Sequence, residues 1–325
     1  MRTPSPRVGV VSRPDDPSVA LVRDALAARG AELVAIPTDR LPLDARVSIE
    51  LDEGAPAITL ADVDLGALRA VWIRHPGLGA LPDDLPPDER AACEGQVEAA
   101  LWSALGCFEG YALDPVDALL GAPGKAQQLR LARRCGLAVP RTLVTNDPAA
   151  VQRFASACDG VVCKLVESGA LSVARDDGGA RSFPTTALTA DDLASLDGLA
   201  LAPMIFQELV PKELEARVTV VGREVFVAAV ETRGVVDVRT DPGLIAGLRR
   251  YDGLPGAVRE GLLRMLDAAG LDFATADLAR TADGRWVFLE FNTVSFFDHV
   301  ERHAGLPIAA AVAGLLLGDR PSRVR

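Results

Sequence analysis

The chain has 325 residues, of which 49% are hydrophobic and 24% are charged, which is enough for a large buried core and two or three lobes. Its net charge of −11 disfavours binding to nucleic acid or to an anionic membrane, because no Lys/Arg-rich run concentrates positive charge. The five cysteines form no CxxC pair, and we see neither a signal segment nor an apolar run of membrane length, so we expect a cytoplasmic protein with reduced thiols.

The first third of the chain has the strand and helix order of an α/β domain. Hydrophobic spacing and turn residues predict, in chain order, a strand at 7–11, a helix at 18–29, a strand at 31–37, a hairpin around 52–55, a strand at 67–74, a helix ending near 105 and a short strand before 117. A strand, helix, strand opening is typical of a parallel sheet. We therefore expect a first domain over residues 1–117.

The remaining two thirds predict a mixture of helices and hairpins. The expected elements are a helix opened by Lys125, a strand around Lys164, an extended segment at 203–210, two hairpins at 214–231 and 273–292, and two helices near the end. The small, polar loop at 167–179 suits either a phosphate-covering loop or a plain hairpin. We divide this part into lobes at 118–205 and 206–325.

The last hairpin carries the sharpest inference about a site. A two-residue turn at Asp283–Gly284 would pair Asp277 with Glu290 and put both carboxylates on one face of the sheet. Asn292, two residues further on, shares that face. Three oxygen ligands of this kind suit Mg²⁺ when nucleotide phosphates complete its octahedron. The alternative is an acidic edge on a solvated hairpin.

Two other charged positions fit phosphate chemistry. Glu215 and Arg217 alternate along one strand, so they share a face, and Arg217 could bind phosphoryl oxygens with both arms of its guanidinium. A surface ion pair is the other interpretation. Lys164 interrupts the apolar strand VVCKLV, where a buried ammonium is costly unless it meets an anion such as phosphate.

The order of these residues resembles the ATP-grasp superfamily. More narrowly, the chain is similar to the ATP-grasp peptide maturases of microviridin-type peptides, the graspetides. The segments that carry this resemblance span nearly the whole chain: IPTDRLP, AVWIRHPG, GKAQQLRLARRCGLAVPRTLVTN, APMIFQELVPKELEARVTVVG and VFLEFNTV. The resemblance implies an N-terminal Rossmann-like pre-ATP-grasp domain followed by a two-lobed ATP-grasp fold.

The resemblance also implies a role for each matching residue, with ATP and Mg²⁺ as cofactors. It assigns the nucleotide phosphates to Lys125 and Lys164, the adenine edge to the segment with Gln207, Glu208 and Leu209, the ribose to Glu215, and the metal to Asp277, Glu290 and Asn292. Arg217 would steady the transferring phosphoryl group, which makes Arg217, Asn292 and Lys164 the expected catalytic residues. Such chemistry depends on positioning and charge neutralisation.

The implied substrate is a ribosomal precursor peptide with a leader and an acidic core. An Asp or Glu side chain would be phosphorylated and then attacked by a Ser or Thr hydroxyl or a Lys amine, which forms ω-ester or ω-amide rings. Arg74, Arg233 and Arg239 are candidates for contacting the acidic peptide, or are ordinary solvated arginines. The resemblance further implies a homodimer.

Several alternatives remain open from the sequence. A RimK-like ligase that joins an amino acid or amine to a small-molecule or protein carboxylate would have the same ATP site, and a regulator could bind nucleotide without catalysis. His299 and His303 could bind zinc, line the acceptor pocket or lie on a surface helix. Asn292-Thr293, where many relatives have proline, and the segment DVRTD at 237–241 depart from the family pattern and leave substrate recognition uncertain.

Overall fold

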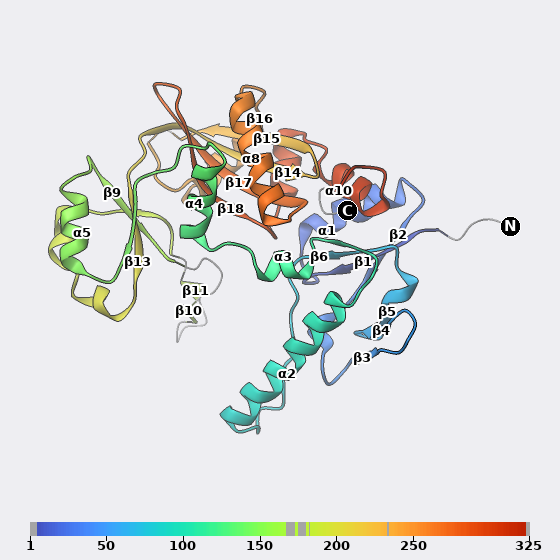
Figure 1. Cartoon of the computed structure of the whole chain (residues 1–325). Coiled ribbons are helices and arrows are strands. Elements are labelled where there is room, and N and C mark those ends of the chain that lie inside the picture. Colours follow the sequence, from blue (N-terminus) through green and yellow to red (C-terminus); the bar gives the residue numbers. More distant parts are fainter. Residues whose placement is uncertain (1–4, 167–172, 175–179, 182, 233, 323–325) are drawn as a thin grey trace.

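The computed structural model describes residues 5–322, apart from 167–172, 175–179, 182 and 233. The described strands form five sheets, and the helices pack around them in regions that follow one another along the chain (Figure 1). In this part of the chain, each helix is too short or too polar to cross a lipid bilayer.

The N-terminal region is built on a parallel sheet in the order β2-β1-β6-β7. Its elements are β1 (Arg7–Val11), α1 (Pro17–Ala27), β2 (Glu32–Ala35), β6 (Ala70–Ile73), α2 (Pro87–Gly106), β7 (Tyr111–Leu113) and α3 (Val116–Leu120). All four residues of β6 are buried, as expected for a parallel strand covered on both faces. Helix α1 is capped by Asp16, which accepts a hydrogen bond from Ser18 N at 2.9 Å. The predicted parallel α/β opening is confirmed.

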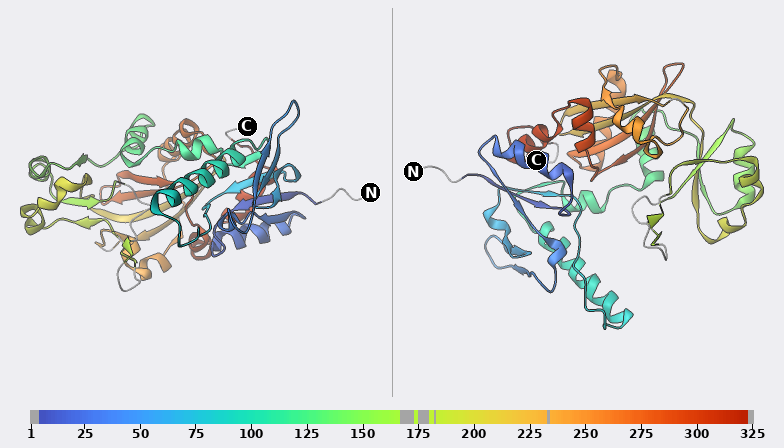
Figure 2. Two further views of the ribbon diagram at one scale, coloured as in Figure 1. Left: turned by 90° about the horizontal axis from the view of Figure 1, so that it is seen from below. Right: turned by 180° about the vertical axis from the view of Figure 1, so that it is seen from behind.

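A small antiparallel sheet and a projecting helix complete this region. The sheet contains β3 (Val47–Glu50), β4 (Ala57–Leu60) and β5 (Val63–Asp64), with 3₁₀ turns at Thr38–Arg40 and Leu65–Ala67. The predicted hairpin around 52–55 joins β3 to β4. Helix α2 buries Leu101, Ala104 and Leu105 near its end, while its first turns extend away from the domain (Figures 1 and 2).

The middle of the chain forms an antiparallel sheet in the order β12-β9-β13-β8. Its elements are β8 (Thr142–Thr145), α5 (Pro148–Ala155), β9 (Val161–Lys164), β12 (Thr186–Ala187), α6 (Ala190–Ala194), a 3₁₀ turn (Asp197–Leu201) and β13 (Met204–Glu208). A separate short pair, β10 (Val173–Ala174) and β11 (Ala180–Arg181), follows β9. Val151, Val161, Leu199 and Phe206 form the core of this region.

The C-terminal sheet has the order β16-β15-β14-β17-β18. Its strands are β14 (Lys212–Val221), β15 (Glu224–Glu231), β16 (Arg249–Arg250), β17 (Phe273–Thr281) and β18 (Trp286–Asn292). The helices are α4 (Lys125–Arg134), α7 (Pro242–Ala246), α8 (Gly256–Ala269), α9 (Asp298–Ala304) and α10 (Ile308–Leu317), with a 3₁₀ turn at Val238–Thr240.

Alternation along β14 separates a packing face from a cavity face. Ala216, Val218 and Val220 are buried in one core with residues of α4 and α8. Glu215 and Arg217 point to the opposite face, where they line a cavity. The sheet therefore presents charged groups on one side because its other side is packed on helices.

Three sets of contacts bear on the expected three-part division of the chain, which remains a proposal. Helix α4 packs on β18 and α8, so it belongs with the C-terminal sheet, although it precedes the middle region in sequence. Strand β13 pairs with β8 and β9 as far as Glu208, so the chain leaves the middle sheet after 208. Helix α10 packs on α1, β6 and β7 as well as on β14, which joins the first and last parts of the chain in one core.

Candidate active site

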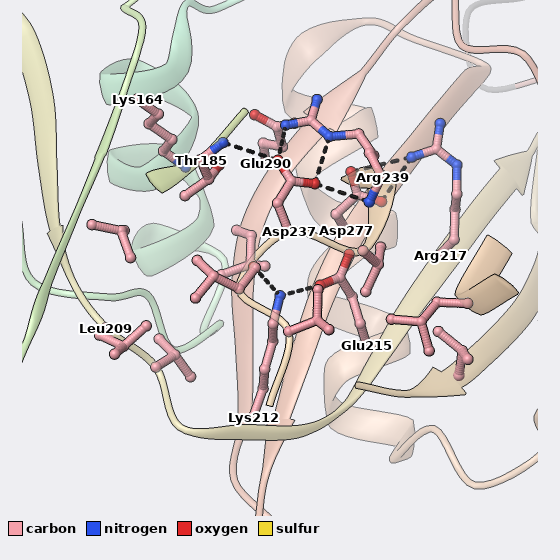
Figure 3. A pocket seen from close by; sticks show the side chains of 18 of the residues that line it. Lys164, Thr185, Leu209, Lys212, Glu215, Arg217, Asp237, Arg239, Asp277 and Glu290 are labelled. Carbon is pink, nitrogen blue, oxygen red and sulfur yellow. Dashed lines mark hydrogen bonds and ion pairs between the residues drawn. The ribbon is translucent and has the colours of Figure 1, made fainter. Parts of the chain in front are cut away.

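A cavity of about 400 Å³ lies where the middle and C-terminal sheets face each other (Figure 3). Residues of both sheets and of the segment that connects them line it, among them Lys164, Gln207, Glu208, Leu209, Lys212, Glu215, Arg217, Asp237, Arg239, Asp277, Leu289, Glu290 and His299. Most of the residues predicted to bind nucleotide or metal are therefore brought together at one place.

Three charged side chains form a row across neighbouring strands on the cavity face. Arg217 of β14 is in register with Asp277 of β17, which is in register with Glu290 of β18. Arg217 Nη1 donates to both carboxylate oxygens of Asp277, at 2.9 and 3.2 Å. Thr275 lies opposite Asn292, so Asn292 follows Glu290 along the same face. The predicted pairing of Asp277 with Glu290 is confirmed.

The turn that joins β17 to β18 differs from the predicted two-residue turn at Asp283–Gly284. Thr281 N donates to Arg285 O at 3.0 Å, which leaves three residues in the loop. Gly284 has a φ of +83°, whereas a type I′ turn requires positive φ at both central residues and Asp283 is not among the residues with positive φ. The prediction of the turn type was wrong.

A β-bulge explains why the carboxylate pairing nevertheless holds. Leu278 lies opposite Phe288, but Asp277 lies opposite Glu290, so Leu289 is an extra residue in β18. The longer loop moves the register by one residue and the bulge moves it back. As a further consequence, the adjacent residues Leu289 and Glu290 both line the cavity.

The two carboxylates are placed where a cation would be stabilised. Burial raises the pKa of Asp277, Arg217 opposes this shift, and the neighbouring Glu290 carboxylate adds to it. Removing water from two adjacent carboxylates is unfavourable without positive charge. A divalent cation held by Asp277, Glu290 and Asn292 fits this oxygen donor set.

Two lysines approach the same carboxylates from the other side of the cavity. Lys125 Nζ donates to Leu165 O at 2.8 Å and lies 4.0 Å from Glu290 Oε2. Burial lowers the pKa of both Lys125 and Lys164, and Glu290 partly offsets this. Arg217 Nε is also buried, without a hydrogen-bond partner among the described residues. A bound phosphate chain would supply the missing anionic oxygens, so these groups fit a nucleotide.

The segment expected at the adenine edge lines the cavity, and only some of its polar groups are available to a ligand. Gln207 is buried and donates from Nε2 to Thr142 Oγ1 at 2.9 Å. The backbone N–H groups of Glu208 and Leu209 already donate to carbonyls beside β8 and β9, at 3.0 and 2.8 Å. These two N–H groups are thus not free to bind a base, and contacts from Glu208 and Leu209 would have to use their carbonyl oxygens.

Glu215 has a lysine partner that the sequence reasoning did not identify. Lys212 Nζ donates to Glu215 Oε2 and, at 2.8 Å, to Val236 O. Burial raises the pKa of Glu215, and the charge of Lys212 opposes this shift. Lys212 stands in the segment QELVPK, three residues before Glu215, but nothing in that spacing distinguishes a site lysine from a solvated one.

The three arginines proposed to contact an acidic peptide have different positions. Arg74 is 2% exposed and donates from Nε to Asp16 Oδ2 at 2.5 Å, so it cannot meet a peptide at the surface, and that prediction was wrong. Arg233 lies outside the described residues. Arg239 lines the cavity and binds Asp237 through Nε at 2.9 Å and Nη2 at 2.6 Å.

The histidine pair does not form a metal centre in the part of the chain that the structure describes. No group of three His, Cys, Asp or Glu side chains there could hold a metal ion, which argues against zinc at His299 and His303. His299 instead lines the cavity, where burial and then the charge of Arg217 lower its pKa.

The N-terminal region of the chain is similar to a known domain family. The model of the MvdD pre-ATP grasp domain matches residues 10–119. A search of curated protein sequences gave no match.

Solved structures match over nearly the whole chain. The macrocyclase MdnC of Microcystis aeruginosa MRC, bound with precursor peptide MdnA, is 31% identical with a TM-score of 0.84, over 97% of this chain and 100% of that one. A RiPP-associated ATP-grasp ligase of Chryseobacterium gregarium, in complex with ADP and a leader and core peptide, is 26% identical with a TM-score of 0.88, over 98% of both chains. The ligase PsnB, complexed with a phosphomimetic variant of a minimal precursor, Mg and ADP, is 26% identical with a TM-score of 0.75, over 97% and 98%.

Proposed function

Since this chain belongs to the ATP-grasp ligases that act on ribosomal precursor peptides, we propose that it activates Asp or Glu side chains of such a peptide and crosslinks them within it. The activated species is an acyl-phosphate, formed from the carboxylate and the γ-phosphoryl group of ATP with release of ADP. A Ser or Thr hydroxyl or a Lys amine of the same peptide then attacks the acyl carbon, and phosphate leaves. Each ω-ester or ω-amide ring formed in this way removes one water from the peptide.

The observation that carries this proposal is the row of Arg217, Asp277 and Glu290 on the cavity face. Two partly buried lysines, Lys125 and Lys164, lie near Glu290. A carboxylate oxygen and a phosphoryl group repel each other, so the enzyme must neutralise negative charge where they meet. Lys125 and Lys164 supply positive charge on one side and Arg217 supplies it on the other. The chain's own side chains thus provide the charge and the positioning that phosphoryl transfer needs.

We assign the cofactors from the same geometry. Asp277, Glu290 and Asn292 would hold Mg²⁺, which would supply positive charge to neutralise the nucleotide phosphates. The relative from Chryseobacterium gregarium is in complex with ADP, and PsnB is in complex with Mg and ADP, which supports this assignment because both share the fold over nearly all of this chain. Leu289 and Leu209 give the cavity apolar surface near the segment expected to face the base.

We also propose that the substrate is a ribosomal precursor peptide and that the protein is a cytoplasmic homodimer. The peptide substrate rests on relatives that are bound to precursor peptides. The homodimer rests on analogy with similar enzymes, and the cytoplasmic location rests on five cysteines without a CxxC pair. Arg239 remains a candidate for an acidic side chain of the peptide, because its guanidinium lies in the cavity.

Mass spectrometry tests the proposal. The precursor peptide encoded beside the gene is incubated with enzyme, ATP and Mg²⁺, and we expect the loss of one or more waters, about 18 Da each. Asn292→Ala should abolish this loss, because it removes a proposed metal ligand while leaving the Arg217–Asp277 pair in place. An unchanged peptide mass, with ADP released on addition of free amino acids or amines, would instead support the ligase that acts on other carboxylates.

A further inference from the structure

The segment Ser295–Phe297 follows the proposed metal strand and lies between the cavity and the N-terminal region. Ser295 is 9% exposed and contacts arginines on both sides. Its hydroxyl accepts a hydrogen bond from Arg217 Nη2, and its carbonyl oxygen accepts from Nη1 and Nη2 of Arg74, each at 3.2 Å. Ser295 thus links Arg217, which lines the cavity, to Arg74, which directly follows β6.

The N-terminal region holds this segment rigidly. The side chains of Arg74 and Asp16 are 1% and 0% exposed and are joined by a hydrogen bond of 2.5 Å. Phe297 N donates to Ser18 Oγ at 3.1 Å in the first turn of α1. A buried, hydrogen-bonded ion pair on this side leaves the Ser295 carbonyl little freedom to move.

Arg217 has few other contacts to determine where its guanidinium points. Among the described residues its hydrogen-bond partners are Asp277 and Ser295, and its Nε has none. Asp277 is also a proposed metal ligand, so its oxygens would be shared between the guanidinium and the cation. The Ser295 hydroxyl is the partner whose position does not depend on the metal.

We propose that Ser295 is a positioning residue for phosphoryl transfer, which holds the Arg217 guanidinium in place while Arg74 and Asp16 of the N-terminal region hold Ser295. This inference rests on the proposed function. The N-terminal region thereby forms part of the catalytic scaffold and contributes to turnover without contacting the nucleotide.

Ser295→Ala separates the two contacts, because it removes the hydroxyl and keeps the backbone carbonyl that Arg74 binds. We expect kcat for peptide-dependent ADP release to fall about 10- to 100-fold, since a misplaced charged group loses transition-state contact. KM for ATP and for the peptide should change little. Ser295→Thr, which retains a hydroxyl, should recover most of the lost kcat, and a kcat of Ser295→Ala equal to that of wild type would overturn the proposal.

A double-mutant cycle tests whether Ser295 acts through Arg217. In an Arg217→Lys background, Ser295→Ala should have little further effect on turnover, whereas full multiplicative loss would show an independent role and contradict the inference.

Tyr111→Phe is the matched control, because Tyr111 Oη donates to Asp272 Oδ2 at 2.7 Å and so joins the same two regions away from the cavity. It should lower the melting temperature and leave kcat unchanged. Absence of peptide-dependent ADP release by wild-type enzyme would instead refute the proposed function.

Discussion

Two lysines line the same cavity with different surroundings. Lys212 is 10% exposed and pairs with Glu215, which is 15% exposed, so two opposite charges compensate each other. Burial lowers the pKa of Lys164, and the charge of Glu290 only partly offsets this decrease. A lysine kept in this state suggests that a ligand supplies the anion.

Replacing each lysine by methionine should therefore have opposite effects on stability. Lys164→Met removes an unfavourable buried charge, so we expect an unchanged or larger free energy of unfolding, with ATP affinity reduced about 10- to 100-fold because a charged contact to phosphate is lost. Lys212→Met leaves Glu215 buried without its cation and should cost on the order of 3 kcal/mol. Urea unfolding and ATP titration calorimetry measure both quantities.

The pH dependence of the second variant gives an internal check. Burial raises the pKa of Glu215 above 4.5 even beside Lys212, and loss of that lysine can only raise it further. A group whose pKa is higher in the folded than in the unfolded protein contributes stability that is fully present below its unfolded-state pKa. This contribution is lost as pH rises through its folded-state pKa. Lys212→Met should thus approach wild-type stability as pH falls toward 4.5, and a deficit that does not shrink would contradict the assigned pairing.

At the scale of the element, the β17–β18 hairpin shows what alternation can and cannot predict. Period-two spacing placed Asp277, Glu290 and Asn292 on one face, as the structure has them. The three-residue loop and the bulge at Leu289 were not foreseen, because turn residues identify a turn more readily than its length, and a bulge depends on packing on both faces. Phe288 and Phe291 both pack in the core with α4 and α8, which a strand without the bulge could not achieve.

Substitutions in the turn distinguish the observed loop from a type I′ turn. Asp283 accepts hydrogen bonds from Thr281 Oγ1 and, at 3.5 Å, from Arg285 N, so Asp283→Gly should destabilise the hairpin. In a type I′ turn the same change would relieve strain and stabilise it. Gly284→Ala should cost about 1 kcal/mol because of the positive φ. Denaturant unfolding gives the sign, and turnover should be unaffected, since the turn does not line the cavity.

At the scale of the whole molecule, hydrophobic spacing predicted where the helices and strands lie, but not which of them pack against each other. The strand at 7–11 and the helices near 308–317 and 125–134 occur where expected. The sequence does not show that α10 packs on α1 or that α4 packs on β18, because long-range packing leaves no periodic signal. Arg74 illustrates the same limit, since an arginine beside a strand was expected at the surface and instead binds Asp16 in the interior.

The Arg74–Asp16 pair should stabilise the N-terminal region and, because Arg74 also donates to the Ser295 carbonyl, its contact with the C-terminal region. Asp16→Asn preserves a good N-cap for α1 but leaves Arg74 buried without its counter-ion, which should cost about 3 to 5 kcal/mol. Asp15→Asn, one residue away with 71% of its side chain exposed, is the control and should change stability by about 0.5 kcal/mol or less.

Acid titration of the same variants identifies the charge as the cause. Burial acts to raise the pKa of Asp16, but the approach of His75 Nδ1 to 3.5 Å from Asp16 Oδ2 and the charge of Arg74 outweigh it and hold the pKa well below the ordinary 3.8. A group whose pKa is lower in the folded than in the unfolded protein contributes stability above its unfolded-state pKa. This contribution is lost as pH falls through its folded-state pKa. The stability difference between wild type and Asp16→Asn should therefore be constant from pH 7 to about 5 and shrink below 3.8. A difference that persists in acid would mean that the cap or the packing, and not the ion pair, accounts for the loss of stability in Asp16→Asn.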